Sequence, residues 1–331
     1  MHGSGGKTGG LGLALLSAFA FGGSGVAAKP LIDLGLDPLQ VVWMRVAGAA
    51  LILLPVALRS RALLRQRPGL VAGFGLLAIT GCQALYFLAI ARVPVGVAIL
   101  VEFLGPALLL GWIRFVQRRP VTRAAALGVV LATAGMTCVV EVWSGLAFDA
   151  LGLFYAFGAA CCQVAYFVLA DHGTGASDAP EPVAVIAHGL VIGALVLTAA
   201  AHPWTMDWSV VGHQAALGDR DVPAVLLIGW IVLVSTVLAY LTGVIAVRTL
   251  SPQVAGVVAS LEAVVGTVLA WVLLAEHLGP AQVTGGALVL AGALVAQTAA
   301  AAATGASGGS GGADTAAAVP DALPQPEPST S

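Results

Sequence analysis

Long apolar runs, each about the length of a membrane-crossing helix, recur along most of this sequence and are separated by short charged clusters. A helix needs about 20 apolar residues to cross the ~30 Å hydrocarbon core of a bilayer. Ten stretches fit this requirement, at 11–28, 39–58, 70–90, 93–113, 124–140, 151–170, 183–201, 222–247, 254–275 and 281–300. With only 9% charged residues, the chain cannot cover a soluble globule of 331 residues. The sequence therefore predicts an all-α polytopic membrane protein with ten transmembrane helices.

The distribution of Lys and Arg predicts the orientation of these helices. If the N-terminus is inside, ten Lys and Arg residues lie on the cytoplasmic side and three lie outside, a clear positive-inside bias. Most of the bias comes from two loops, at 59–67 and 114–123. We therefore expect both termini to be cytoplasmic, in a plasma or inner membrane. The net charge of −2 leaves no basic surface for nucleic acid.

Motifs for ATP binding, metal binding and nucleophilic catalysis are missing from the sequence. We expect no cofactor, no metal and no catalytic residue, so the chain is predicted not to be an enzyme. The four cysteines all fall inside predicted spans at no metal-ligand spacing, and we interpret them as buried apolar filler: Cys82, Cys138, Cys161 and Cys162.

The two halves of the chain match each other at a shift of 160 residues, which aligns Gly96 with Gly256, Glu102 with Glu262 and Pro120 with Pro280. Chance alignment of alanine-rich helices would not explain a matched pair of intramembrane carboxylates. Each half holds five predicted helices, and since five is odd, the repeats would be inverted. The expected organisation is an N-terminal tail, two five-helix repeats and a disordered C-terminal tail, at 1–10, 11–143, 150–300 and 301–331.

The matched segments carry a resemblance to a known family. Residues 93–106 (VPVGVAILVEFLGP), followed by 118–120 (RRP), resemble the fourth-helix region of EamA-type transporters of the drug/metabolite transporter superfamily. Residues 248–262 (RTLSPQVAGVVASLE), followed by 274–276 (LAE) and Pro280, resemble the same region. The Glu-Phe-x-Gly-Pro form is most similar to the threonine/homoserine exporter branch. The resemblance implies two inverted five-helix repeats and efflux of small metabolites or amino acids, and brings no agreed set of catalytic residues.

Three charged residues lie within the predicted spans: Glu102, Glu262 and Arg45. A carboxylate in the bilayer costs about 2.5–3.5 kcal/mol, so each glutamate should face a cavity or a partner. An ionised glutamate could hold a substrate ammonium, and a protonated one could couple proton movement to export. Alternatively, the glutamates could cap helices or pair with Arg45. Arg45 itself could balance a substrate carboxylate or a glutamate, or its side chain could reach the outer interface.

Polar and aromatic residues at helical spacing form a second set of candidates. Gln83 and Tyr86 share one helix face, as do Gln163 and Tyr166, and Tyr240 resembles them. They could line a substrate cavity or form hydrogen bonds between helices. His188, well inside a span, could relay protons or simply pack.

The leading hypothesis is a secondary transporter that exports a small metabolite by alternating access, with an amino acid such as threonine or homoserine as substrate. Its partners would then be this small molecule, the lipid bilayer and, if transport is coupled, protons. One alternative is efflux of a cationic or amphiphilic drug. An alternative of another class is an intramembrane enzyme or a non-transporting receptor.

Overall fold

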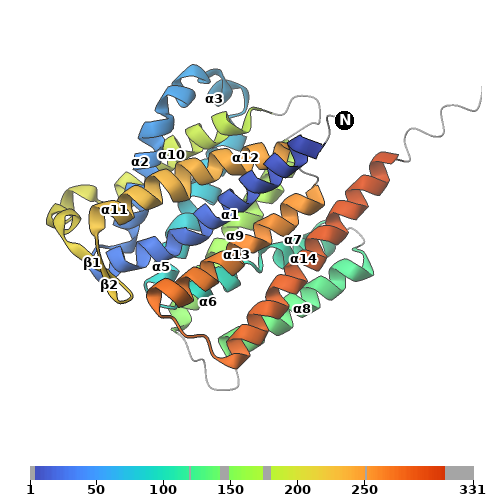
Figure 1. Cartoon of the computed structure of the whole chain (residues 1–331). Helices are drawn as coiled ribbons and strands as arrows, with labels where there is room; N and C mark the ends of the chain where they lie inside the picture. Colours follow the sequence, from blue (N-terminus) through green and yellow to red (C-terminus); the bar gives the residue numbers. More distant parts are fainter. Residues whose placement is uncertain (1–3, 119–120, 142–148, 174–179, 250–251, 310–331) are drawn as a thin grey trace, which may run out of the picture.

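The computed structural model describes residues 4–118, 121–141, 149–173, 180–249 and 252–309, and shows a mainly helical protein (Figure 1). The described residues of the first half form the helical elements α1 (Ser4–Asp33), α2 (Pro38–Arg59), α3 (Ala62–Gln66), α4 (Pro68–Gly73), η1 (Phe74–Cys82), α5 (Gln83–Ile90), α6 (Val95–Glu102), α7 (Gly105–Phe115) and α8 (Arg123–Val140). The second half contains α9 (Ala150–Gly173), α10 (Pro182–Ala201), η3 (Pro203–Thr205), η4 (Trp208–Gly212), β1 (Gln214–Leu217), β2 (Arg220–Pro223), α11 (Ala224–Gly229), η5 (Trp230–Leu238), α12 (Ala239–Thr249), α13 (Pro252–Leu274) and α14 (Pro280–Gly309).

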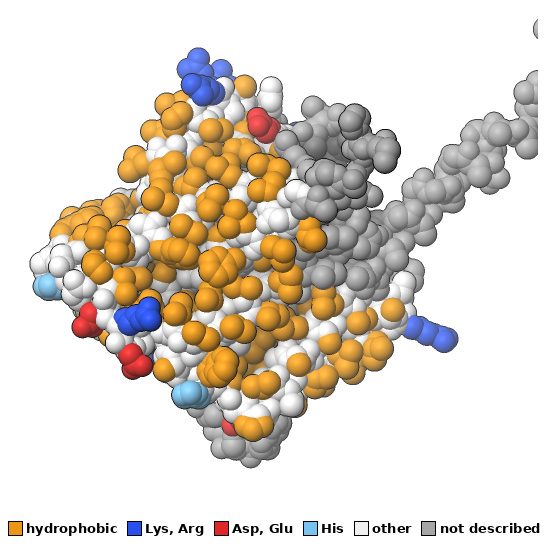
Figure 2. All heavy atoms as spheres, viewed as in Figure 1, with side chains coloured by type: hydrophobic (Ala, Val, Ile, Leu, Met, Phe, Trp, Pro, Cys, Tyr) orange, Lys and Arg blue, Asp and Glu red, His pale blue; other side chains and the backbone are white. Residues whose placement is uncertain are grey.

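Seven helical segments of the described chain are long and apolar enough to cross a bilayer, at 9–33, 38–59, 68–90, 95–115, 123–140, 182–201 and 224–246. Three shorter apolar helices lie where the other predicted spans fall, at 150–165, 260–274 and 280–296. The ends of the predicted spans agree closely with those of the helices: the span expected at 183–201, for example, is the helix at 182–201. The face shown in Figure 2 is mostly hydrophobic, with charged side chains near its edges, which suits contact with lipid.

Helices extend into both of the segments that were expected to be tails. α1 begins at Ser4, inside the segment assigned to an N-terminal tail. α14 continues to Gly309, into the segment predicted to be disordered from 301. The residues beyond Leu294 are rich in alanine, which has the highest helix propensity, so the helix continues past the apolar run. Residues 310–331 lie outside the described part of the chain.

The third long helix of each half contains a π-helical segment at the same place. η1 begins six residues after the helix starts at Pro68, and η5 begins six residues after Ala224. Within them, the Thr80 hydroxyl donates to the Gly75 carbonyl at 2.8 Å and the Thr236 hydroxyl to the Ile231 carbonyl at 2.7 Å. Both bonds reach back five residues. π-helical turns are rare and are found frequently at functional sites.

Helices α8 and α14 pack backbone against backbone and run antiparallel (Figure 1). A Cβ added at Gly128 would lie 2.7 Å from the Gly292 carbonyl oxygen, and one added at Gly135 would lie 2.5 Å from that of Gly285. Such close approach needs glycine on both helices and is typical of helix pairs in membranes.

The fourth span is broken in the middle, between α6 and α7. The break comprises Phe103 and Leu104, immediately before Gly105 and Pro106. Proline has no N–H, and its ring clashes with the carbonyl four residues earlier. In this helix that carbonyl belongs to Glu102, so α6 ends at this glutamate.

The segment between α10 and α11 folds into two 3-10 turns and a β-hairpin. β1 and β2 are antiparallel, with Gln214 opposite Pro223 and Leu217 opposite Arg220. At the turn, Gly218 adopts φ +61°, and a Cβ there would lie 2.7 Å from the Leu273 carbonyl oxygen. The hairpin turn therefore packs directly on the end of α13.

Candidate functional site

Arg45 connects the two halves of the chain through hydrogen bonds to neutral oxygen atoms. Its Nε donates to Thr236 Oγ1 at 2.8 Å, and its Nη2 donates to the Ser235 carbonyl at 3.0 Å, both in η5. Its Nη1 donates to Ser24 Oγ of α1 at 2.7 Å and to Gln83 Oε1 of α5 at 2.6 Å. Only 2% of Arg45 is exposed, so the guanidinium is inside the bundle and not at the outer interface.

The three charged residues of the predicted spans interact electrostatically with one another. Arg45 interacts electrostatically with Glu262 and with Tyr86, and Glu262 interacts with Glu102 and Arg45. Tyr240, whose ring meets Phe21 edge-on at 5.0 Å, also lies within range of Arg45. Glu102 comes from the first repeat and Glu262 from the second, so the site is built by both.

Glu102 accepts a hydrogen bond from a cysteine. The Cys82 thiol, at the end of η1, donates to Glu102 Oε1 over an Sγ–O distance of 3.2 Å. Cys82 is buried, and the interpretation of all four cysteines as apolar filler is wrong for this one. Cys161, in contrast, is exposed. Because a thiol is a weak donor, this bond leaves Glu102 able to accept a stronger one.

Glu262 and Tyr86 lie against glycines of α1. A Cβ at Gly22 would lie 2.8 Å from the Glu262 carbonyl oxygen, so α1 crosses α13 at the glutamate. A Cβ at Gly25 would overlap the Tyr86 hydroxyl. These glycines let α1 approach both residues closely enough to close one side of the site.

The remaining candidates are placed as follows. Gln83 belongs to the site, through its bond to Arg45. Gln163 of α9 lies at the helix break, where a Cβ on Gly105 would be 2.8 Å from its Oε1. The side chain of Tyr166 lies outside the described part of the structure. His188 is buried, and its Nδ1 lies 2.8 Å from the Ala184 carbonyl of its own helix. This arrangement fits the alternative in which His188 simply packs.

Of the neutral residues that bind Arg45, only Gln83 was predicted, and Ser24, Ser235 and Thr236 were not, nor was a carboxylate that caps α6. Glu276 follows α13 and accepts from the N–H groups of Val95 at 2.8 Å and Gly96 at 3.2 Å. Burial raises the pKa of this carboxyl above its ordinary value, although the two N–H groups act against that rise. Glu276 was part of the family motif, but nothing in one sequence shows that its partner is a helix start 180 residues away.

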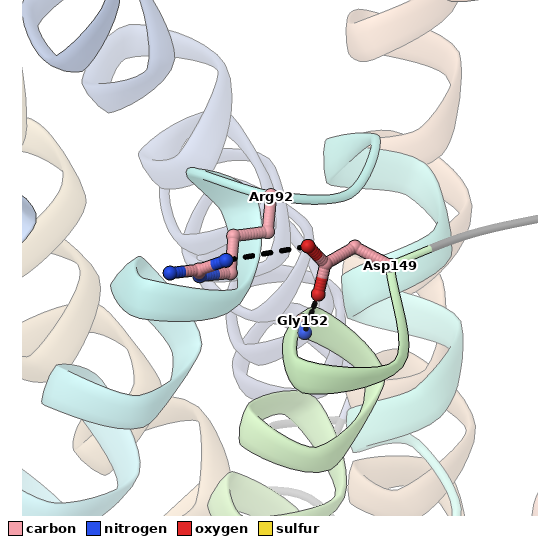
Figure 3. A network of polar contacts seen from close by, with 3 residues as sticks. All are labelled: Arg92, Asp149 and Gly152. Carbon is pink, nitrogen blue, oxygen red and sulfur yellow. Dashed lines mark hydrogen bonds and ion pairs between the residues drawn. The ribbon is translucent and has the colours of Figure 1, made fainter.

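A pair of charges joins the segment after α5 to the start of α9 (Figure 3). Arg92 Nη1 lies 3.2 Å from Asp149 Oδ2, while Oδ1 accepts from the Gly152 N–H at 2.9 Å. The Gly152 bond is the main cause that holds the pKa of Asp149 below its usual range, with Arg92 adding to it. Both side chains are well exposed, so this pair contributes little to stability.

Among the cavities of the described part of the chain, a larger and a smaller one are lined mainly by apolar side chains. The larger, of about 1100 Å³, opens among η1, α7, α8 and α9, and its lining includes Leu104, Trp112, Thr133, Phe157 and Cys161. The smaller, of about 270 Å³, lies among α1, η5, α13 and the hairpin. Neither is lined by Glu102, Glu262 or Arg45. In the described residues, no cluster of His, Cys, Asp and Glu could hold a metal ion.

Comparison with known proteins identifies a family and several relatives. The chain matches the EamA-like transporter family twice, at residues 8–141 and 150–298. It is 30% identical over 219 residues to the threonine/homoserine exporter RhtA of Escherichia coli K12, covering 64% of this chain and 65% of that protein. RhtA of Salmonella typhimurium SL1344 is 28% identical over 220 residues, 65% of this chain and 66% of the relative. The chain thus matches just under two thirds of each relative's length.

A solved crystal structure shares the fold. It covers 88% of this chain and 96% of its own chain with a TM-score of 0.55, at 19% sequence identity. At that identity the likeness concerns the fold alone.

Proposed function

Because the chain belongs to the EamA-like transporter family, with two copies of its domain, we propose that it is a secondary transporter that exports a small amino acid of the threonine/homoserine type. The RhtA relatives support this substrate class. The observation that carries the proposal is that Arg45, Glu102 and Glu262, which come from both repeats, interact electrostatically with one another.

The charges of this site suit a substrate with an ammonium group. With both glutamates ionised, two negative charges face one positive charge, which leaves an excess of −1. Arg45 is already bonded to four neutral oxygens, so it neutralises one glutamate electrostatically without forming a closed ion pair. The site can therefore accept one further positive charge, either a substrate ammonium or a proton. Competition between the two would couple export to proton uptake.

The proposed topology has ten crossings in two inverted repeats, with both termini in the cytoplasm. The antiparallel packing supports it: Gly128 meets Gly292 and Gly135 meets Gly285, as expected for repeats related by a two-fold axis between α8 and α14. The π-helical segments at matching positions support it too. The arginines of the 59–67 and 114–123 loops support the orientation. The two repeats would then move against each other to expose the site alternately.

Counterflow in proteoliposomes tests the proposal. We expect labelled threonine to accumulate against unlabelled threonine or homoserine, and the Glu102→Gln and Glu262→Gln variants to lose at least tenfold in rate. Glu181→Gln is the matched control, because Glu181 is exposed at the start of α10 and caps no backbone group. Equal rates in wild type, both variants and empty liposomes would exclude transport of these amino acids.

The excess negative charge also suits a cationic drug, so the same liposomes should be challenged with hydrophobic cations. Inhibition of threonine counterflow by homoserine but not by these cations supports the amino-acid proposal, and the reverse favours drug efflux. Proton coupling is tested separately: net efflux that is unchanged when the pH gradient is collapsed excludes it.

A further inference from the structure

The carboxylate of Glu276 joins the two repeats at the outer end of the proposed pathway. It comes from the turn after α13, and both its oxygens accept from the first N–H groups of α6, at 2.8 and 3.2 Å. The chain reaches this position because Ala275 adopts φ +53° and the Glu276 N–H donates back to the Ala270 carbonyl at 3.3 Å. A helix start with a bound carboxylate is a stable arrangement, since the free N–H groups and the helix dipole both favour a negative charge.

The helix that Glu276 caps is also the helix that carries Glu102. α6 runs only from Val95 to Glu102, and the break before Pro106 separates it from α7. Because α6 is a continuous helix of eight residues, a movement of its first residues also moves Glu102 at its end. Next to Glu276, a Cβ on Gly96 would lie 3.4 Å from Thr267 Cγ2 and 3.7 Å from Leu278 Cδ1, so both repeats are in close contact there.

We propose that Glu276 is an outer latch: it holds α6 against the second repeat while the outer side is closed, and releases α6 when that side opens. The inference rests on the orientation and the alternating access proposed above. At the shift of 160 residues that relates the repeats, Val116 stands where the second repeat has Glu276. The inner counterpart is thus an apolar side chain, and only the outer latch can change its charge.

The charged groups around Glu276 are few. Lys29 and Asp33 of α1 interact with it and pair with each other at 3.0 Å. His277 is its exposed neighbour in the chain, and the Glu141 carboxylate of α8 approaches Gly279, three residues further on. From the segment before α6, Arg92 is engaged with Asp149.

A cysteine reporter at Thr267 measures opening without any substrate. Thr267 Oγ1 is buried and has no hydrogen-bond partner, so Thr267→Cys is a mild change, made in a background in which the four native cysteines are replaced. Glu276→Ala removes both hydrogen bonds to α6, and we expect a membrane-impermeant thiol reagent to label the reporter from outside about tenfold faster. Glu181→Gln should leave the rate unchanged. A rate unaltered by Glu276→Ala would overturn the latch.

The pH dependence separates a latch from a merely structural cap. Burial raises the pKa of Glu276 in the closed state, whereas solvation on opening would return it toward its ordinary value. The closed state therefore binds the proton better, and raising the external pH should favour opening. Glu276→Gln cannot titrate, so the wild-type labelling rate divided by that of Glu276→Gln should rise with pH. This ratio cancels the ionisation of the reporter thiol, and a flat ratio contradicts the latch.

A disulfide tests whether the contact must open during transport. In the Gly96→Cys, Leu278→Cys double variant, oxidation should stop counterflow and a reductant should restore it. Full counterflow in completely cross-linked protein would show that the contact never opens. If wild type carries no threonine at all while labelling responds to Glu276→Ala and to pH, the latch stands and the proposed substrate fails.

Discussion

The most informative perturbation is a pair of substitutions at Arg45 that separates its hydrogen bonds from its charge. Arg45→Lys keeps the positive charge, but a single ammonium nitrogen cannot reach oxygens on α1, α5 and η5 at once. Arg45→Met removes both the bonds and the charge while filling a similar volume. Transport that Arg45→Lys keeps and Arg45→Met loses, measured per folded protein, therefore reports the charge.

The number of hydrogen bonds made by Arg45 gives the expected loss of stability. Four hydrogen bonds depend on the guanidinium, and side-chain hydrogen bonds within membranes average about 0.6 kcal/mol each. Loss of all four in Arg45→Met lowers the free energy of unfolding by about 2 kcal/mol, and Arg45→Lys, which keeps only the bonds that one ammonium can reach, loses part of this. The charge acts on function instead: Arg45→Met leaves Glu102 and Glu262 with an excess of −2, whereas Arg45→Lys keeps it at −1. We expect Arg45→Lys to retain part of the wild-type counterflow and Arg45→Met to lose it.

Equilibrium unfolding in mixed detergent micelles and threonine counterflow, normalised to folded protein, measure the two effects. If Arg45→Lys is as stable as wild type, the four bonds do not hold the helices together and the assignment of their role is wrong. If Arg45→Met transports at the wild-type rate, no counter-charge is needed beside the glutamates.

Three further predictions follow from single contacts. Gly135→Val should destabilise the protein by about 1–3 kcal/mol, because its Cβ would lie 2.5 Å from a backbone oxygen of α14. Gly12→Val should not destabilise it, because Gly12 has open space around it. Thermal unfolding of the two variants tests this difference. Cys82→Ala removes the thiol that bonds Glu102 and should shift the pH optimum of counterflow, while Cys82→Ser should preserve it. The pKa of Asp149 is lowered in the folded protein. Its contribution to stability is therefore present above the ordinary carboxyl range and is lost as the pH falls through the lowered pKa. Unfolding measured against pH should show this loss in wild type and not in Asp149→Asn.

Much of the fold could be predicted because the bilayer restricts what an apolar run can do. Helices such as 182–201 begin and end within a residue or so of the predicted limits, since charge, proline and glycine mark the points where the chain leaves lipid. The π-helical segments and the α6–α7 break could not be located in this way. They leave the composition of the span unchanged, and they depend on hydrogen bonds and on the position of Pro106 within the helix.

The charged residues of the candidate site could be picked out from the sequence, whereas most of the groups that bind them could not. Glu102, Glu262 and Arg45 stand out because ionised groups are rare in spans. Their neighbours Ser24, Ser235 and Thr236 are ordinary intramembrane residues by sequence, and only the folded arrangement brings their oxygens to one guanidinium. The same holds for Glu276, whose partners are backbone N–H groups that no sequence pattern can mark.

The single arginine also explains how a duplicated fold can hold an unsymmetrical substrate. Arg45 lies seven residues after Pro38, the first residue of α2, and the residue seven after Pro182, the first of α10, is Gly189. A Cβ at Gly189 would overlap the ring of Phe74, in η1, so the second half has no room for a side chain where the first half has a cation. The glutamates are duplicated and the arginine is not. Two identical halves would give two equivalent sites, whereas this asymmetry leaves one excess negative charge and therefore favours one cationic group at a time.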